Sequence, residues 1–265
     1  MKAFQFNTTP GIRFGSDYSI GTAEEVSKKL GNKILFVTDP GLVKIGLHEK
    51  TITELQKYSE ILIFDNVEAD PSINTLMSCV QQGRDFDATG VIGFGGGSSM
   101  DVSKLTALLI GSNENIHEAW GVANAKGPRL PLALYPTTSG TGSEVTPISI
   151  ITQEDLEKKG VSSPIILPDL AILDPSLTLG LPPHITAATG IDAMVHAIES
   201  YASKSVNNNL ISQTLAKEAL KLLGSSIRQA VINGKDIEAR SNMLVGSMLA
   251  LSLIHISEPT RQIVI

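Results

Sequence analysis

A glycine run is the part of this sequence best suited to bind a phosphate-bearing ligand. An apolar strand pattern beginning at Val91 leads into Gly95-Gly96-Gly97-Ser98 and then into a helical pattern. Glycine permits close backbone approach, and a helix N-terminus presents free N–H groups to an anion. We therefore expect a pyrophosphate site here, with a ligand-free strand–helix turn as the alternative. The run does not match the G-x-G-x-x-G fingerprint of an ordinary Rossmann domain.

Two further segments could contact the same kind of ligand. Asp39 follows another apolar strand pattern, where a carboxylate can accept hydrogen bonds from ribose hydroxyls and would repel a 2′-phosphate. Because Asp39-Pro40-Gly41 is also favourable turn sequence, a simple turn is the alternative. Segment 136–144 has five hydroxyl side chains and two glycines directly after a strand pattern. It suits phosphate or amide recognition, with a flexible surface loop as the alternative.

Asp192 and His196 are the candidate metal ligands. Their i, i+4 spacing places a carboxylate and an imidazole on one helix face, about one turn apart. Oxygen and nitrogen together suit a divalent transition metal, and a helical Asp–His ion pair is the alternative. Two ligands are too few for a tight site, so further ligands are expected downstream. His48 and His117 lie in stretches that we interpret as surface, and Cys79 is most simply a packing residue.

Composition excludes several classes of protein. The 265 residues include 21 Lys+Arg and 27 Asp+Glu, giving a formal net charge of −6, and the sequence pI is about 5.4. This acidic balance argues against nucleic-acid binding. No apolar stretch approaches the ~20 residues that span a bilayer, and the start lacks the apolar region of a signal peptide. A single cysteine fits a reducing compartment, so we expect a cytoplasmic protein without a membrane partner.

The elements that must position these residues fall into two groups. Apolar runs at 33–39, 61–64, 90–94 and 132–135 predict strands, and segments 42–58, 72–86 and 100–110 between them predict helices. Such alternation favours right-handed βαβ units and a mainly parallel sheet. After Pro182-Pro183 only helical patterns follow, at 184–203, 207–233 and 236–250. We predict an α/β nucleotide-binding domain over 1–183 and an all-helical domain over 184–250, with a hairpin or loop tip at 153–159.

In combination these segments resemble the iron-containing (group III) alcohol dehydrogenases. The resemblance covers nearly all of residues 1–250. Its motifs are Thr38-Asp39-Pro40-Gly41, Gly95-Gly96-Gly97-Ser98 with Asp101 and Lys104, the segment Pro136–Glu144, Leu167-Pro168-Asp169 with Leu173-Asp174-Pro175, and the segment Thr189–Glu199. Several motifs in the same order make the assignment specific, although each alone is weak.

The resemblance implies an NAD-binding α/β domain and a helical metal-binding domain, with the active site in the cleft between them. By position, Asp39 would contact the adenosine ribose and favour NAD over NADP. Gly96, Gly97 and Ser98 would hold the pyrophosphate, and Asp192 with His196 would be the first two ligands of Fe²⁺. The remaining implied cofactor contacts are Thr137, Thr138 and Thr141, which would line the cleft, and Lys159, which would reach the cofactor hydroxyls.

The activity implied is hydride transfer between NAD and a short primary alcohol or diol, or its aldehyde or ketone. Family members are commonly dimers or larger, and Phe4–Phe14 would pair across such an interface. Two alternatives remain: a zinc enzyme of the glycerol dehydrogenase or dehydroquinate synthase type, and a nucleotide-binding module without catalysis. The sequence does not identify the alcohol, the direction of the reaction or the metal.

The end of the chain departs from the family pattern. The family has two further histidine ligands on later helices, whereas Leu251–Arg261 resembles the in-frame translation of a transposon-end sequencing adapter. We therefore expect 251–265 to be a non-native tail, and we do not count His255 as a ligand. The chain would then be C-terminally truncated and hold half of a metal site. We expect negligible dehydrogenase activity from it.

Overall fold

Four of the predicted strands lie side by side in one parallel sheet. The computed structural model describes residues 4, 6–205 and 208–253. The six-stranded sheet has the order β1-β9-β6-β4-β2-β3, and every neighbouring pair is parallel. Its strands are β1 (Gly11–Phe14), β2 (Lys33–Val37), β3 (Glu60–Phe64), β4 (Gly90–Gly95), β6 (Leu132–Pro136) and β9 (Leu170–Leu173). The predicted mainly parallel α/β sheet is confirmed.

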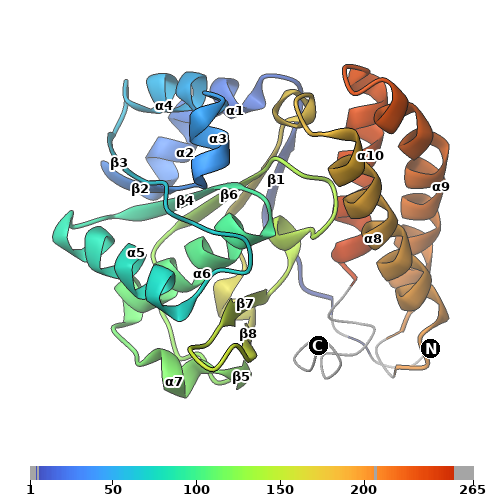
Figure 1. Ribbon diagram of the computed structural model, residues 1–265. Helices are drawn as coiled ribbons and strands as arrows, with labels where there is room; N and C mark the ends of the chain where they lie inside the picture. The colour runs from blue at the N-terminus through green and yellow to red at the C-terminus, as the bar shows by residue number, and fades with distance from the viewer. Residues whose placement is uncertain (1–3, 5, 206–207, 254–265) are drawn as a thin grey trace.

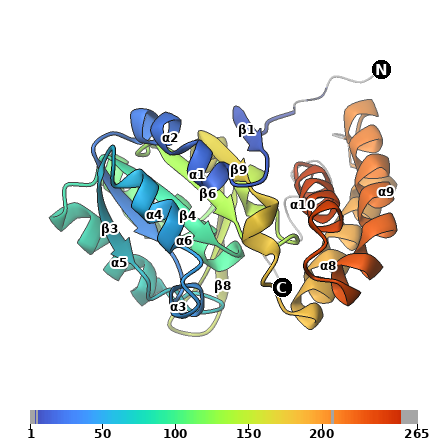
Figure 2. The ribbon, with the colours of Figure 1, turned by 90° about the horizontal axis from the view of Figure 1, so that it is seen from above.

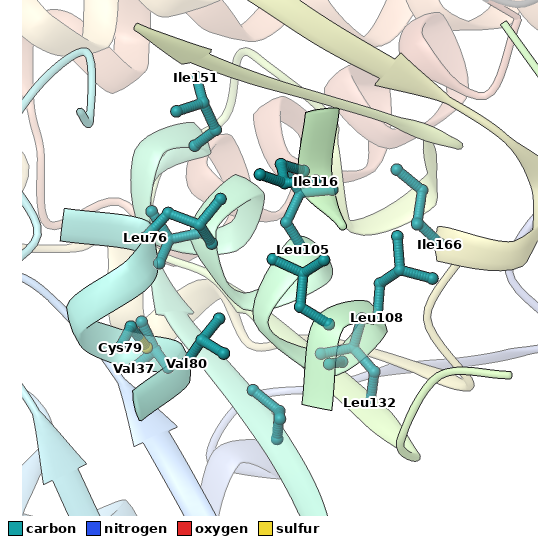
Figure 3. Packing of buried hydrophobic residues seen from close by; sticks show 14 of the residues in the cluster. Val37, Leu76, Cys79, Val80, Leu105, Leu108, Ile116, Leu132, Ile151 and Ile166 are labelled. Atoms are coloured by element: carbon teal, nitrogen blue, oxygen red, sulfur yellow. The ribbon is translucent and has the colours of Figure 1, made fainter. Parts of the chain in front are cut away.

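Helices cover both faces of this sheet, so its central strands are apolar on both sides (Figure 1). In β2, Ile34 and Phe36 enter one buried cluster while Leu35 and Val37 enter the other. Figure 3 shows the larger cluster, in which β2 and β6 pack against α5 and α6. The helices of this part are α1 (Tyr18–Gly21), α2 (Ala23–Leu30), α3 (Pro40–Lys44), α4 (Glu49–Leu55), α5 (Ile73–Asp85), α6 (Gly97–Ser112) and α7 (Ile116–Ala119).

A second, three-stranded sheet lies below the main one in Figure 1. Its order is β5-β8-β7, with β5 (Gly121–Val122) parallel to β8 (Lys158–Ser162) and β7 (Ile148–Thr152) antiparallel to β8. The β7–β8 connection confirms the hairpin predicted at 153–159. Short 3-10 turns lie before this hairpin at Ser143–Val145 (η1) and after it at Pro164–Ile166 (η2) and Pro175–Thr178 (η3).

Three helices form the rest of the described chain. They are α8 (Pro183–Ala202), α9 (Leu210–Ile232) and α10 (Ile237–Leu251), and they pack together beside the α/β part (Figures 1 and 2). Their shared core contains Leu223, Met243 and Leu251. This arrangement confirms the predicted fold class. The division at 183/184 stays our proposal, and α8 begins at Pro183. No helix in the described ranges has both the length and the apolar character needed to cross a membrane.

Several local predictions were wrong. The helix expected over 42–58 is split into α3 and α4, because Gly46 adopts φ +69° between them. His48, which stands at the N-cap position of α4, is buried rather than on the surface. Strands β1 and β9 were not predicted. Within the described part of Phe4–Phe14, β1 pairs with β9 of the same chain on one side, and the pairing of this segment across a dimer interface stays a prediction. Of the tail expected at 251–265, only 251–253 lie within the described residues.

Candidate cofactor and metal site

The turn from β4 into α6 forms a cradle of backbone without side chains. Gly95 has φ +153°, a conformation that favours glycine, and a Cβ there would lie 2.7 Å from the Ser99 hydroxyl. Gly96 is the N-cap of α6, and a Cβ at Gly96 would meet only Thr138, at 3.6 Å. The first N–H groups of this 16-residue helix have no partners within the helix. The cradle therefore fits an anion such as a pyrophosphate.

Asp39 lies beside this cradle with its two oxygens in different roles. Oδ1 accepts a hydrogen bond of 3.0 Å from the Leu42 backbone N–H and so caps α3. Oδ2 is 3.5 Å from the place where a Cβ of Gly95 would stand. The turn-forming and ligand-binding interpretations of Asp39 are thus compatible, because one oxygen stays available toward the glycine run.

Segment 137–142 is packed against both parts of the chain, unlike a flexible surface loop. On one side, the Thr137 N–H donates to the Gly95 carbonyl at 2.9 Å, and Thr141 lies 3.0 Å from a Cβ placed on Gly97. On the other side, a Cβ at Gly140 would lie 2.6 Å from the Thr189 Cβ of α8. The segment therefore joins the glycine cradle to the helical part.

A pocket of about 380 Å³ opens between these elements. It is lined by Asp70, Pro71, Gly97, Ser98, Asp101, Thr141, Ser143, Thr146, Ile148, Ile150, Thr152, Lys158, Asp192, His196 and Leu251. It thus brings together five of the ten predicted site residues, from both the cofactor and the metal groups. The other five, Asp39, Gly96, Thr137, Thr138 and Lys159, are not in its lining. Four of these border the glycine cradle instead.

Lys159 is separated from the rest by the register of the β7–β8 hairpin. In this register Lys158 faces Thr152, and both line the pocket. Lys159 faces Ile151, which is part of the buried core on the opposite side. The Lys158 ammonium also forms a 2.7 Å ion pair with Asp70 at the pocket lining. The lysine that lines the pocket is therefore Lys158, one position before the predicted Lys159.

Asp192 and His196 lie on one face of α8 and line the pocket together. The Asp192 Oδ1 and His196 Nε2 atoms are 3.6 Å apart, and Nδ1 of the same ring is 3.9 Å from Glu199 Oε2. An oxygen and a nitrogen at this separation fit two positions of one divalent metal ion. The described residues contain no group of three or more His, Cys, Asp or Glu side chains that could hold a metal.

A buried polar cluster borders the pocket, and two of its members, Asp101 and Ser143, line it. The Lys104 ammonium donates to Ser143 Oγ at 2.7 Å and to the Ile148 carbonyl at 2.7 Å, and the Ser143 hydroxyl donates to Asp101 Oδ1 at 2.6 Å. Burial lowers the pKa of Lys104 to about 8 and raises the pKa of Asp101. It also raises the pKa of the neighbouring Glu144 carboxyl to about 7. The sequence offered one signal, the i, i+3 spacing of Asp101 and Lys104 after the glycine run.

Comparisons with known proteins match the chain almost throughout. Residues 9–175 match the sequence model of the iron-containing alcohol dehydrogenases, and 186–258 match that of the C-terminal part of the same family. The chain is 40% identical over 251 residues to a sulfoacetaldehyde reductase of Bilophila wadsworthia. It is 44% identical over 228 residues to long-chain-alcohol dehydrogenase 1 of Geobacillus thermodenitrificans. These alignments take in 94% and 84% of the chain.

Solved structures of the same family superpose on most of this chain. An alcohol dehydrogenase from Oenococcus oeni superposes with a TM-score of 0.91 at 34% identity, over 97% of this chain and 67% of that one. A sulfoacetaldehyde reductase from Bifidobacterium kashiwanohense, solved with NAD⁺, superposes with a TM-score of 0.89 at 30% identity, over 97% and 68%. The chain spans 64% and 57% of the length of the two curated relatives above. The second family match ends inside 251–265, and the foreign origin of that segment stays a prediction.

Proposed function

Because the chain belongs to the iron-containing alcohol dehydrogenase family, we propose that it supplies the NAD-binding part and the first metal ligands of an Fe²⁺-dependent alcohol dehydrogenase. Its reaction would interconvert a short-chain alcohol or diol with the aldehyde or ketone. One observation supports this proposal most. A single pocket contains both Gly97-Ser98 of the phosphate cradle and the Asp192–His196 pair.

Each end of the pocket has its own task in this proposal. The cradle Gly96-Gly97-Ser98 holds the pyrophosphate at the N-terminus of α6. Asp39 contacts the adenosine ribose through Oδ2, since Oδ1 is engaged by Leu42. We assign the cofactor-contacting lysine to Lys158 in place of Lys159, because only Lys158 lines the pocket. Thr137, Thr138 and Thr141 close the cleft around the cradle.

The helical side holds the reacting groups. Bound Fe²⁺ would supply Lewis acidity toward an alcohol oxygen, and bound NAD would supply the hydride acceptor. Asp192 and His196 would hold the metal ion, and Ile148 and Ile150 would form an apolar wall beside the alcohol, because all four residues line one pocket. The relatives include a sulfoacetaldehyde reductase and a long-chain-alcohol dehydrogenase, so the substrate class rests on the alcohol–carbonyl chemistry they share.

Calorimetric titration of the 265-residue chain with NAD tests the cofactor part. In Gly96→Ala the new methyl meets Thr138 only at van der Waals distance, so the fold tolerates it, yet it stands where the pyrophosphate approaches the backbone. We expect the dissociation constant for NAD to rise at least tenfold. Gly180→Ala is the matched control, because a Cβ there has nothing within 4 Å. Equal NAD affinity in the wild type and Gly96→Ala would contradict the assignment of the cradle.

The metal part is tested by repeating the titration with Fe²⁺, in the wild type and in His196→Ala. We expect Fe²⁺ to tighten NAD binding in the wild type and to lose this effect in the variant. NAD binding that is indifferent to metal in both proteins would favour a nucleotide-binding module without catalysis, and a response to Zn²⁺ alone would favour the zinc enzymes.

The expectation of negligible dehydrogenase activity from this chain is checked in the same samples. Iron-dependent turnover of ethanol or propanediol would refute it.

A further inference from the structure

The outer edge of strand β7 has no neighbouring strand in the small sheet. β7 is the last strand in the order β5-β8-β7, so one row of its backbone groups lacks a strand partner, apart from Thr152, whose N–H donates to the Pro71 carbonyl at 2.9 Å. Unpaired buried backbone groups cost free energy comparable to a lost hydrogen bond. The same edge forms one wall of the pocket, through Thr146, Ile148, Ile150 and Thr152. Groups that are not part of a neighbouring strand must therefore form hydrogen bonds with the backbone of this edge.

Two side chains of α6 occupy that position. The Lys104 ammonium donates to the carbonyls of Thr146, at 2.9 Å, and Ile148, at 2.7 Å. Asp101 Oδ2 accepts the N–H of Ile150 at 2.9 Å, and the Asp101 carbonyl accepts the hydroxyl of Ser149 at 2.9 Å. Lys104 and Asp101 thus offer donors and acceptors along β7 in the way that a neighbouring strand would.

The Ser143 hydroxyl joins the two side chains. It accepts from the Lys104 ammonium at 2.7 Å and donates to Asp101 Oδ1 at 2.6 Å, which fixes its rotamer and the direction of its proton. Ser143 itself lines the pocket. Lys104 has no exposed surface, so water does not compete for these hydrogen bonds.

We propose that Lys104 and Asp101 are positioning residues that take the place of a neighbouring strand along β7 and so fix the pocket wall at the reactive end of the bound cofactor. The proposal rests on the NAD binding proposed above. The β7 wall lies in the same pocket as Asp192 and His196, and Gly97 and Ser98 of the phosphate cradle line that pocket as well. A cofactor held at the cradle must extend its reactive ring along this wall to approach the metal pair.

The geometry of α6 explains why one helix can do both tasks. Gly97 and Lys104 are seven residues apart, so their Cα atoms are separated by about 10 Å along the helix axis. The cradle and the wall are thereby held at a fixed separation. The charged state of the cluster agrees with this role. Burial lowers the pKa of Lys104 only to about 8, and Asp101 and Glu144 both favour its ammonium form.

The test compares NAD with ADP-ribose, which carries the same pyrophosphate and adenosine but lacks the nicotinamide ring. In Lys104→Met we expect the dissociation constant for NAD to rise at least tenfold and that for ADP-ribose to change less than threefold. Damage confined to folding would weaken both ligands in parallel. Lys126→Met is the control, because Lys126 lies on the surface in an ion pair with Glu118.

Ser143→Ala gives a second, milder variant in case Lys104→Met does not fold. It removes the hydroxyl between the two side chains while leaving the Lys104 and Asp101 contacts to β7 in place, and we expect about a threefold loss for NAD alone. The inference is overturned if NAD and ADP-ribose weaken equally, or if neither weakens, in a wild type that binds both. Failure of the wild-type chain to bind either ligand would instead overturn the proposed function, and this inference with it.

Discussion

Gly142 is the position where the cofactor segment approaches the helical part most closely. It adopts φ +50°, and a Cβ placed there would lie 2.1 Å from the Leu251 Cβ and 3.5 Å from the Leu251 Cα. These atoms belong to the last turn of α10 and cannot rotate away as the end of a long side chain could. Gly142→Ala must therefore separate segment 137–142 from α10 or distort one of them.

The expected cost has two parts. A left-handed conformation costs a non-glycine residue about 1–2 kcal/mol. Overpacking of a tightly packed contact costs about 1–3 kcal/mol more. Together they predict a destabilisation of about 2–5 kcal/mol. For a chain of this size each kcal/mol lowers the melting temperature by about 2–4 °C, so the expected fall is roughly 4–20 °C.

Differential scanning calorimetry of the wild type, Gly142→Ala and Gly180→Ala checks this prediction. Gly180→Ala should stay within about 0.5 kcal/mol of the wild type, because nothing lies within 4 Å of its new methyl. Gly142→Ala should also weaken NAD binding, since Thr141 and Leu251 line the pocket on either side of the contact. A melting temperature for Gly142→Ala within 2 °C of the wild type would refute the close approach.

Three further predictions follow from charged groups. Asp70→Asn frees Lys158 from its ion pair and should tighten NAD binding about two- to fivefold at low salt, with a smaller gain at 0.5 M NaCl, as titration would show. The raised pKa of Glu144, about 7, means that the folded state binds more protons between pH 4.5 and 7, so stability falls as pH rises through this window. Urea unfolding should accordingly find Glu144→Gln more stable than the wild type at pH 8 but not at pH 4.5. Arg240→Met removes the buried guanidinium that donates to the Gly234 carbonyl, the Thr186 hydroxyl and the Leu181 carbonyl, and should lower the urea-unfolding free energy by about 2–5 kcal/mol.

The sequence was sufficient for elements whose burial leaves a local pattern. Strands buried on both faces, such as β2 and β4, give continuous apolar runs, and their positions were predicted closely. The start of the helix predicted over 72–86 was also placed closely, because it is set locally: the Ser72 hydroxyl accepts from the Thr75 N–H within one helical turn. By contrast, β1 is a four-residue edge strand of mixed sequence that is defined by its pairing with β9. β9 is a buried apolar run of only four residues, and its pairing with both β1 and β6 is what identifies it as a strand.

Features that depend on distant contacts were the ones missed. The choice between Lys158 and Lys159 depends on the register of one hairpin, and a slip of one residue moves a side chain to the opposite face. A lysine within a helix is ordinarily exposed, so the complete burial of Lys104 could not be foreseen without its acceptors, which lie 39 to 44 residues away in the chain. In both cases the residue type was available in the sequence, but its surroundings were not.

The candidate site depends on segment 137–142 as much as on the residues expected to bind ligands. This segment contacts the cradle through Thr137 and Thr141, and it contacts α8 through Gly140 and Thr189. Asp192 is three residues beyond Thr189 on α8, less than one helical turn away. A ligand that shifts this segment would therefore also act on the helix that carries the metal ligands. Linkage then requires that any tightening of NAD binding by a metal is matched by an equal tightening of metal binding by NAD.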